Sequence, residues 1–240
     1  MFKHVSVQIT PCVFNCDNKD VCYLKKRNKY NDKLDFYNVF KIFNKEDYTV
    51  YLSICDITSL NLARILLKCI NNLNITIPYS IYKDHKISKE KHDNDKISLS
   101  VYNIKDILDA PANYTKIFLI KNDESYKLAK IILTSHGFIN IHLAIDINYI
   151  DEYKIKELLK LKEQTQSIGI SLDSCLENYS LHKKCVYNDN YVDIDYDNTY
   201  RKCPFVKCGT LINTESFEEL INNKIKPNCI YHKVFGGTNE

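Results

Sequence analysis

Three cysteines lie close together near the start of the sequence, within the stretch ITPCVFNCDNKDVCYLKK. Cys12, Cys16 and Cys22 directly follow His4–Thr10, a run with the composition of a β-strand. Three thiolates on one loop can hold three irons of an oxygen-sensitive 4Fe–4S cluster and leave the fourth iron open to a ligand. The alternatives are a zinc site or three unrelated buried thiols.

A second group of cysteines lies in the C-terminal third, from Cys175 to Cys208. This stretch has few large apolar residues, so metal binding would help a small lobe to fold. The expected ligands are Cys175, Cys185, Cys203 and Cys208, and Cys229 could substitute for one of them. An iron–sulfur cluster, a structural zinc and no metal at all remain open.

The composition sets the background for these cysteines. The chain has 240 residues, of which 45% are hydrophobic and 26% charged, as in ordinary globular proteins. Its net charge of +3 gives no argument for nucleic-acid binding. The longest apolar runs, such as Thr115–Ile120, are far shorter than the roughly 18–20 residues of a membrane span.

The N-terminal residues lack the apolar core and cleavage site of a secretory signal, so we expect a cytoplasmic protein. In a reducing compartment, ten cysteines indicate metal ligation or redox chemistry rather than disulfides.

Short β-branched runs alternate with helical patterns through the first two-thirds of the chain, which predicts an α/β fold with a parallel sheet. We interpret six runs as buried strands, at His4–Thr10, Tyr48–Ile54, Ile75–Ile81, Lys96–Asn103, Thr115–Lys121 and Ile141–Ile147. Four segments have helical patterns, at Leu34–Asn44, Ser59–Leu73, Glu124–His136 and Asp151–Gln164. The chemistry of such sheets lies at the carboxyl ends of the strands, here in a curved or partial barrel.

The alternation is predicted to stop near Ser167, where a turn-rich tail begins. Tyr191–Tyr196 and Thr199–Lys202 are predicted to form a hairpin around Asp197 and Asn198. The sequence therefore predicts two domains, residues 1–166 as the barrel and residues 167–240 as a cysteine-rich extension.

The first cysteine loop resembles that of the radical S-adenosylmethionine (radical SAM) superfamily. Those enzymes have a three-cysteine loop after the first strand of a partial (β/α)6 TIM-like barrel, usually with CxxxCxxC spacing and an aromatic residue beside the last cysteine. Here CVFNC matches the first half, and Tyr23 follows Cys22. The sequence departs from the pattern at Asp17–Val21, where five residues separate cysteines that are usually two residues apart.

The resemblance also implies where S-adenosylmethionine would bind. In the family a glycine-rich segment after the second strand contacts the methionyl ammonium, and Tyr51–Thr58 occupies that place without a glycine. Ser53, Asp56 and Thr58 could supply the acceptors, and Tyr23 would help to position the cofactor. Alternatively, Thr58 or Ser59 caps a helix and Asp56 is a first-turn charge.

Polar residues follow the later strands as well and could contact ribose, carboxylate or substrate. They are Asn103, Lys121, Asn122 and Asp146. Each is individually more typical of ordinary loop chemistry.

The C-terminal cysteines resemble the extensions called SPASM and twitch domains, whose cysteines ligate auxiliary iron–sulfur clusters. The short tail, a cysteine-rich hairpin lobe, suits the twitch form, although a family glycine is missing from Ser180–Lys184. Their common substrates imply a modest preference for a peptide or protein.

Together these resemblances imply that a reduced 4Fe–4S cluster cleaves S-adenosylmethionine to a 5′-deoxyadenosyl radical, which abstracts hydrogen from the substrate. The electron would come from a donor such as a flavodoxin or ferredoxin. The alternative is a non-enzymatic iron–sulfur or zinc protein that acts through a partner.

Overall fold

The structure is a computed structural model that describes residues 3–8, 48–54, 57–70, 72–85, 96–165, 169–183, 185, 191–194, 200–201, 203 and 230–235. The chain forms two compact units. Unit 1 comprises Met1–Ile97 and Val186–Lys226, and unit 2 comprises Ser98–Cys185 and Pro227–Glu240.

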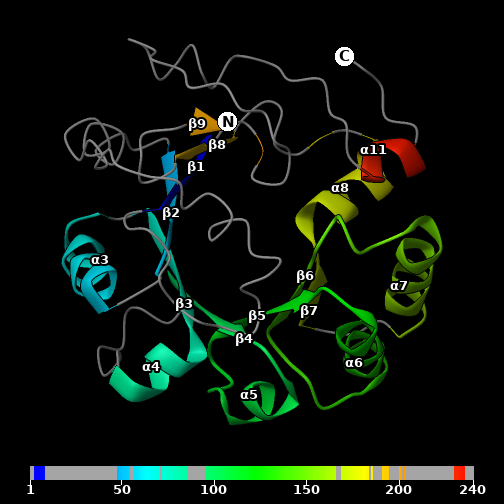
Figure 1. Ribbon diagram of the computed structural model, residues 1–240, viewed down its shortest axis with the longest axis horizontal. Helices are drawn as coiled ribbons and strands as arrows, with labels where there is room; N and C mark the ends of the chain where they lie inside the picture. The colour runs from blue at the N-terminus through cyan, green and yellow to red at the C-terminus, as the bar shows by residue number, and fades with distance from the viewer. Residues whose placement is uncertain are drawn as a thin grey trace. The chain divides into compact units, whose positions relative to one another are not determined.

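Unit 1 is built on a mainly parallel sheet whose strands run in the order β3, β2, β1, β8, β9. Among the strand pairs formed by the described residues of this unit, β8–β9 is antiparallel and the others are parallel. Figure 1 shows the helices α3 and α4 on one side of strands β2 and β3. The elements are β1 (Lys3–Gln8), β2 (Tyr48–Ser53), α3 (Ile57–Cys69), β3 (Leu73–Pro78), α4 (Tyr79–His85), β8 (Tyr191–Ile194) and β9 (Tyr200–Arg201).

One face of this sheet is apolar because every second residue of its strands is a large hydrophobic one. Val5, Val50 and Leu73 are register partners, and Val192 continues the row on β8. All four side chains are buried. Leu60, Ala63 and Leu66 form the buried stripe of the amphipathic helix α3.

The strands of unit 2 are parallel and follow one another in the order β7, β6, β5, β4. Figure 1 shows α5, α6 and α7 along one face of these strands. The elements are β4 (Ile97–Val101, which begins at the boundary of the units), α5 (Ile104–Asp109), β5 (Thr115–Ile120), α6 (Asp123–Thr134), β6 (Ile141–Ile145), α7 (Glu152–Thr165), β7 (Ile170–Leu172), α8 (Ser174–His182) and α11 (Ile230–Phe235).

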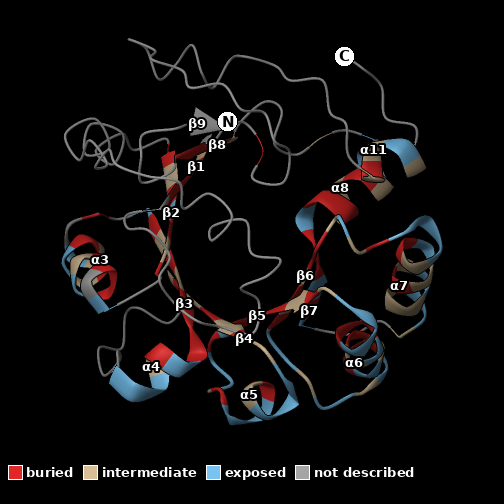
Figure 2. Cartoon of the chain, viewed as in Figure 1, coloured by how far each residue is buried: buried red, intermediate tan, exposed pale blue. Residues whose placement is uncertain are grey.

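The core of unit 2 lies between its sheet and these helices. Phe118, Leu143 and Leu172 form one buried row across three strands. Ile132 of α6 and Leu158 of α7 are also fully buried. Figure 2 shows the buried inner sides and exposed outer sides of both helices.

The structure confirms the predicted α/β class and the parallel arrangement of the strands. Each of the six predicted strands exists, with ends that differ by a few residues. The predicted hairpin exists as β8 and β9, with Asp193 opposite Arg201. The partial (β/α)6 barrel and the separate cysteine-rich lobe stay predictions. The predicted helix at Leu34–Asn44 lies outside the described residues.

Two expectations about the chain's organisation are wrong. The alternation does not stop near Ser167, because β7 and α8 continue it and β7 pairs in parallel with β6. The strand β7 has only three residues, which is too short for a periodic pattern to reveal. The helix α3 begins at Ile57, so that Thr58 and Ser59 lie inside it and neither is its N-cap.

Among the described residues, every helix falls short of the length and apolar character that crossing a membrane requires.

Candidate functional site

The second face of the sheet in unit 1 carries polar side chains from four neighbouring strands. We call this set the polar face; it consists of Tyr191 and Asp193 on β8, His4 and Ser6 on β1, Thr49, Tyr51 and Ser53 on β2, and Asn74 and Thr76 on β3. Successive residues of a strand point to opposite faces, so these positions alternate with the buried apolar ones.

The strand register brings these residues together in rows. Ser6 is the register partner of both Asp193 and Tyr51, and Tyr51 is also the partner of Asn74. This row therefore crosses four strands that are about 4.8 Å apart. In the next row, Ser53 is the register partner of Thr76.

A contact between two aromatic side chains lies within the polar face. The Oη atom of Tyr51 is 3.4 Å from Nδ1 of His4, and the ring centroids are 5.9 Å apart. Burial lowers the pKa of His4 and raises the pKa of Tyr51, so both side chains are neutral near pH 7. The pair can therefore donate and accept hydrogen bonds without carrying charge.

The acidic member of the polar face is Asp193, which is only 1% exposed. A buried carboxylate is unfavourable unless it has a charge partner or hydrogen bonds. In the register of the antiparallel pair β8–β9, Asp193 is the partner of Arg201. The face therefore combines neutral polar groups with one acid that has an arginine opposite.

Such a face is unusual, because parallel sheets are generally apolar on both faces. A polar second face is suited to water or a polar ligand rather than to packing helices. The sequence analysis interpreted these runs as buried strands and missed the face. The signal was present as alternation within HVSV, YTVYLS and LNITIP, where polar residues occupy every second position except that of Pro78.

The predicted cofactor segment begins at this face. Ser53 is the last residue of β2, is half-buried and belongs to the polar face. Thr58 lies in the first turn of α3, while Asp56 and Tyr23 lie outside the described residues. The structure therefore positions one of the four predicted cofactor residues on the polar face.

Cys12, Cys16 and Cys22 also lie outside the described residues. The strand before them is nevertheless informative, because β1 and β2 are parallel and Gln8 is the register partner of Ser53. Both strands end level, so the cysteine loop and the cofactor segment start from the same edge of the sheet.

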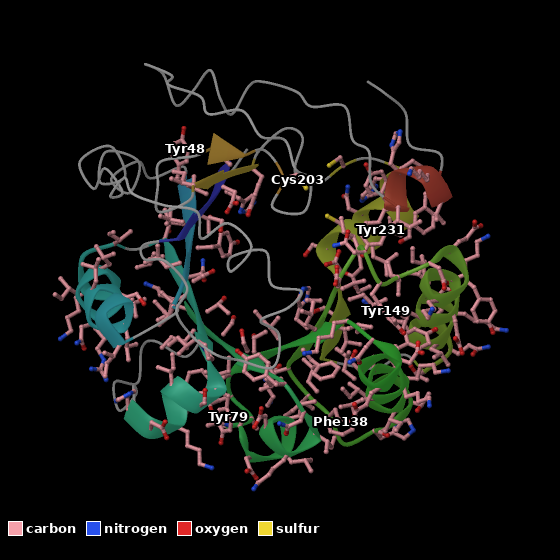
Figure 3. The ribbon with its side chains drawn as sticks, in the orientation of Figure 1. Tyr48, Tyr79, Phe138, Tyr149, Cys203 and Tyr231 are labelled. Atoms are coloured by element: carbon pink, nitrogen blue, oxygen red, sulfur yellow. The ribbon has the colours of Figure 1, made fainter. Side chains whose placement is uncertain are left out.

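The second cysteine group belongs to two units. Cys175 is buried in the first turn of α8, and Cys185 is half-buried a few residues after that helix, both in unit 2. Cys203, labelled in Figure 3, follows β9 in unit 1 and is buried. Cys208 and Cys229 are outside the described part of the chain. Within that part, no three histidine, cysteine or acidic residues are grouped so that they could hold a metal ion.

Polar strand ends in unit 2 have structural roles instead. Asn103 caps α5 by accepting a hydrogen bond of 2.9 Å from the backbone of Asp106. Asn122 forms a capping box with Ser125 at the start of α6. Asp146 accepts hydrogen bonds from the backbone and side chain of Asn148, at 2.9 and 3.0 Å. These contacts support the interpretation that these three residues stabilise loops and helix ends.

Lys121, the remaining strand-end residue, precedes this capping box. Its backbone nitrogen donates a hydrogen bond of 2.8 Å to the hydroxyl of Ser125, and its side chain is half-buried. This bond connects the end of β5 to the start of α6. A contact of the Lys121 side chain with cofactor or substrate stays a prediction.

The sequence analysis also missed the role of Asp173, a buried carboxylate at the end of β7. Its side chain caps α8 by accepting hydrogen bonds from the backbone nitrogens of Cys175 and Leu176, at 3.0 and 3.3 Å. Burial raises the pKa of Asp173 to about 6, against the opposing effect of these hydrogen bonds. The sequence signal was an aspartate directly before a helix, which is typical of an N-cap.

A histidine and a serine form a second polar contact that the sequence analysis did not identify. Nδ1 of His142 on β6 is 2.9 Å from Oγ of Ser171 on β7. Burial lowers the pKa of His142, Glu177 raises it and Lys162 lowers it further. Glu177 also accepts hydrogen bonds from the Lys162 side chain and the Leu172 backbone, which ties α7, α8 and β7 together.

The described residues thus offer two kinds of polar surface, the polar face in unit 1 and the locally paired strand ends in unit 2. Their chemistry has to be judged from the residues themselves. The chain matches no protein-family model, no curated protein and no solved structure.

Proposed function

We propose that the chain is a radical SAM enzyme whose 4Fe–4S cluster is ligated by Cys12, Cys16 and Cys22. The observation that carries the proposal is the position of β1. It lies between two parallel neighbours, β2 and β8, and the three cysteines follow its carboxyl end in the sequence. Chemistry in parallel α/β sheets is typically located at this edge.

The end of β2 supports the proposal further. Because Gln8 and Ser53 are register partners, the segment proposed to bind the methionyl ammonium starts next to the cysteine loop. A cofactor that chelates one iron and also contacts this segment requires that proximity. Ser53, Asp56 and Thr58 would accept hydrogen bonds from the ammonium group, and Tyr23 would lie beside the cluster.

The character of the polar face fits this cofactor. Its side chains are hydroxyls, an amide, a neutral imidazole and phenols, together with one acid opposite an arginine. They can bind a polar ligand without the repulsion or desolvation that unpaired charges would impose. When bound, the cluster and S-adenosylmethionine supply one-electron chemistry that no side chain provides. The chain would orient these groups and exclude water.

The proposal includes an auxiliary metal centre in the C-terminal part of the chain. Its ligands would be Cys175, Cys185, Cys203 and Cys208, with Cys229 as a substitute for one. The centre would hold an iron–sulfur cluster or a structural zinc. We further propose a cytoplasmic enzyme that receives electrons from a flavodoxin or ferredoxin and modifies a peptide or protein.

The proposal is tested by anaerobic reconstitution followed by an iron count and an assay of 5′-deoxyadenosine after reduction with dithionite. The variant with Cys12, Cys16 and Cys22 all replaced by Ala should form no 5′-deoxyadenosine and lose about four irons per chain. Cys69→Ala is the matched control, because Cys69 ends α3 and belongs to neither proposed ligand set. This control should match the wild type in both measurements.

Two outcomes would contradict the proposal. Formation of 5′-deoxyadenosine by the triple variant would remove these cysteines from the cluster. A brown, iron-loaded wild type that forms none would favour a non-enzymatic iron–sulfur protein that acts through a partner.

A further inference from the structure

The side chains of His142 and Ser171 form a close polar pair on adjacent strands of unit 2. They are register partners on β6 and β7, and Nδ1 of His142 is 2.9 Å from Oγ of Ser171. Ser171 is exposed and His142 is half-buried. Both lie on the opposite face of their strands from the buried side chains of Leu143 and Leu172. The pair therefore places a hydroxyl that solvent can reach beside a base, which is the arrangement of an activated nucleophile.

The surroundings of the imidazole favour the form that accepts a proton. Burial lowers the pKa of His142, Glu177 raises it and Lys162 lowers it. Because burial has the largest effect, the neutral ring predominates near pH 7. When the ring hydrogen is on Nε2, Nδ1 accepts the hydrogen bond of the Ser171 hydroxyl and can take its proton. The carboxylate of Glu177 then favours the imidazolium that the transfer produces, and a hydrogen bond of 2.9 Å from the backbone of Leu172 holds that carboxylate beside β7.

Apolar side chains lie beside the pair on the same face of the strands. Ile117 on β5 is the register partner of His142, and Ala144 lies two residues beyond His142 on β6. Leu119 is the register partner of Ala144. All three side chains are half-buried, so they form a partly accessible apolar strip next to the nucleophile. Such a strip suits a short apolar acyl chain, which gains by leaving water, and disfavours a charged one.

We propose that Ser171 is a nucleophile with His142 as its general base, and that the pair accepts acyl groups from esters with a short apolar acyl chain. Oγ of Ser171 forms a bond to the ester carbonyl carbon while its proton passes to Nδ1 of His142. The bond from that carbon to the alcohol oxygen breaks, and the leaving alcohol takes the proton from His142. A water molecule, which gives a proton to His142, then attacks the acyl-serine, and the carboxylic acid is released as the Ser171 hydroxyl is restored.

This activity is separate from the proposed radical chemistry, because neither His142 nor Ser171 belongs to a proposed metal or cofactor site. The test uses the full-length chain, isolated anaerobically, and a serine-directed fluorophosphonate as the probe. A nucleophilic serine displaces fluoride from the phosphorus of this reagent, and peptide mass spectrometry locates the label. The wild type should be labelled at Ser171. His142→Asn keeps a polar side chain but removes the base, so it should slow this labelling about a hundredfold or more.

Hydrolysis of p-nitrophenyl butyrate provides the second measurement. Ser171→Ala should reduce the rate to that of the background reaction. Ser100→Ala is the matched control, because Ser100 belongs to the same row across the strands but is separated from His142 by Ile117. It should hydrolyse the ester at the wild-type rate. Circular dichroism establishes that each variant is folded, and location of the label in the wild type requires no variant at all.

Three results would overturn the inference. The first is a wild type in which the fluorophosphonate leaves Ser171 unmodified. The second is hydrolysis by Ser171→Ala that is as fast as hydrolysis by Ser100→Ala. The third is labelling of His142→Asn at the wild-type rate, which would show that the contact between His142 and Ser171 only stabilises the strand pair.

Discussion

The strands of the two units have similar apolar faces but different second faces. In unit 1, Pro78 is the one apolar side chain among the described positions of the second face. In unit 2 the second face is mixed, because Ile117, Leu119 and Ala144 interrupt it between the polar positions of Ser98, Ser100, Thr115, His142 and Ser171. A sheet face that serves only packing needs no continuous polar surface, so the difference supports the proposal that a ligand binds to unit 1.

The polar residues of the two units also differ in their hydrogen bonds. In unit 2, Asn103, Asn122 and Asp173 cap helices, and Asp146 closes a turn. Those polar groups satisfy backbone nitrogens and stabilise the fold. In the polar face of unit 1, by contrast, the side chains of Thr49, Asn74 and Thr76 make no hydrogen bond to another described residue.

The largest expected difference between the two faces is the loss of stability when one side chain is removed from each. Phe118→Ala on the apolar face of unit 2 should lower the free energy of unfolding by about 3–5 kcal/mol, because it leaves a cavity among buried neighbours. Thr49→Ala on the polar face should change it by less than about 1 kcal/mol. Urea unfolding followed by circular dichroism measures both. Similar losses in the two variants would show that the polar face is packed as a core.

The pH dependence of stability should reveal the buried cap of α8. The folded protein holds the pKa of Asp173 at about 6, above the ordinary value of 3.8. Between these values the folded state binds more protons than the unfolded state, so this residue's contribution to stability falls as the pH rises from about 4 to 6. The change corresponds to about 3 kcal/mol.

Asp173→Asn keeps an oxygen that can cap the helix and removes the titration. Its free energy of unfolding, relative to wild type, should therefore rise by roughly 2 kcal/mol between pH 4 and pH 7. A difference that stays constant with pH would mean that Asp173 titrates normally in the folded protein.

A smaller effect is expected at the capping box of α6. Asn122→Ala should lower the free energy of unfolding by about 1 kcal/mol, because the backbone nitrogen of Ser125 loses its acceptor. Asn122→Asp retains an acceptor and places a negative charge at a helix N-terminus, so it should remain close to wild type. An alanine variant as stable as wild type would show that water replaces the cap fully.

Much of the fold could be predicted from the sequence. The β-branched runs indicated the strands correctly, since burial of alternate residues such as Val50 and Leu52 depends on local pattern. The short elements were missed because β7 and α5 have too few residues for periodicity. Helix α3 was predicted to begin two residues late, since Ser59 resembles an N-cap but is buried inside the helix.

The candidate site was less predictable because it depends on register between distant strands. The sequence shows that Ser6 and Tyr51 occupy alternating positions, but not that they are partners or that Asp193 joins their row. The cysteines, by contrast, could be identified as candidate metal ligands from their spacing in the sequence alone. That prediction stays a prediction, because most of these cysteines lie outside the described residues.

The smallest expected effect is also the sharpest test of the contrast between the units. Asn74 and Asn122 are both asparagines next to or within a parallel strand, yet only Asn122 caps a helix. Asn74→Ala should therefore change the free energy of unfolding by less than about 0.5 kcal/mol, since no hydrogen bond to a described residue is lost. The chain has no tryptophan, so circular dichroism is the suitable signal for the urea titration. If Asn74→Ala costs as much as Asn122→Ala, then polar groups in both units hold the fold together, and the polar face loses its distinction as a surface kept for a ligand.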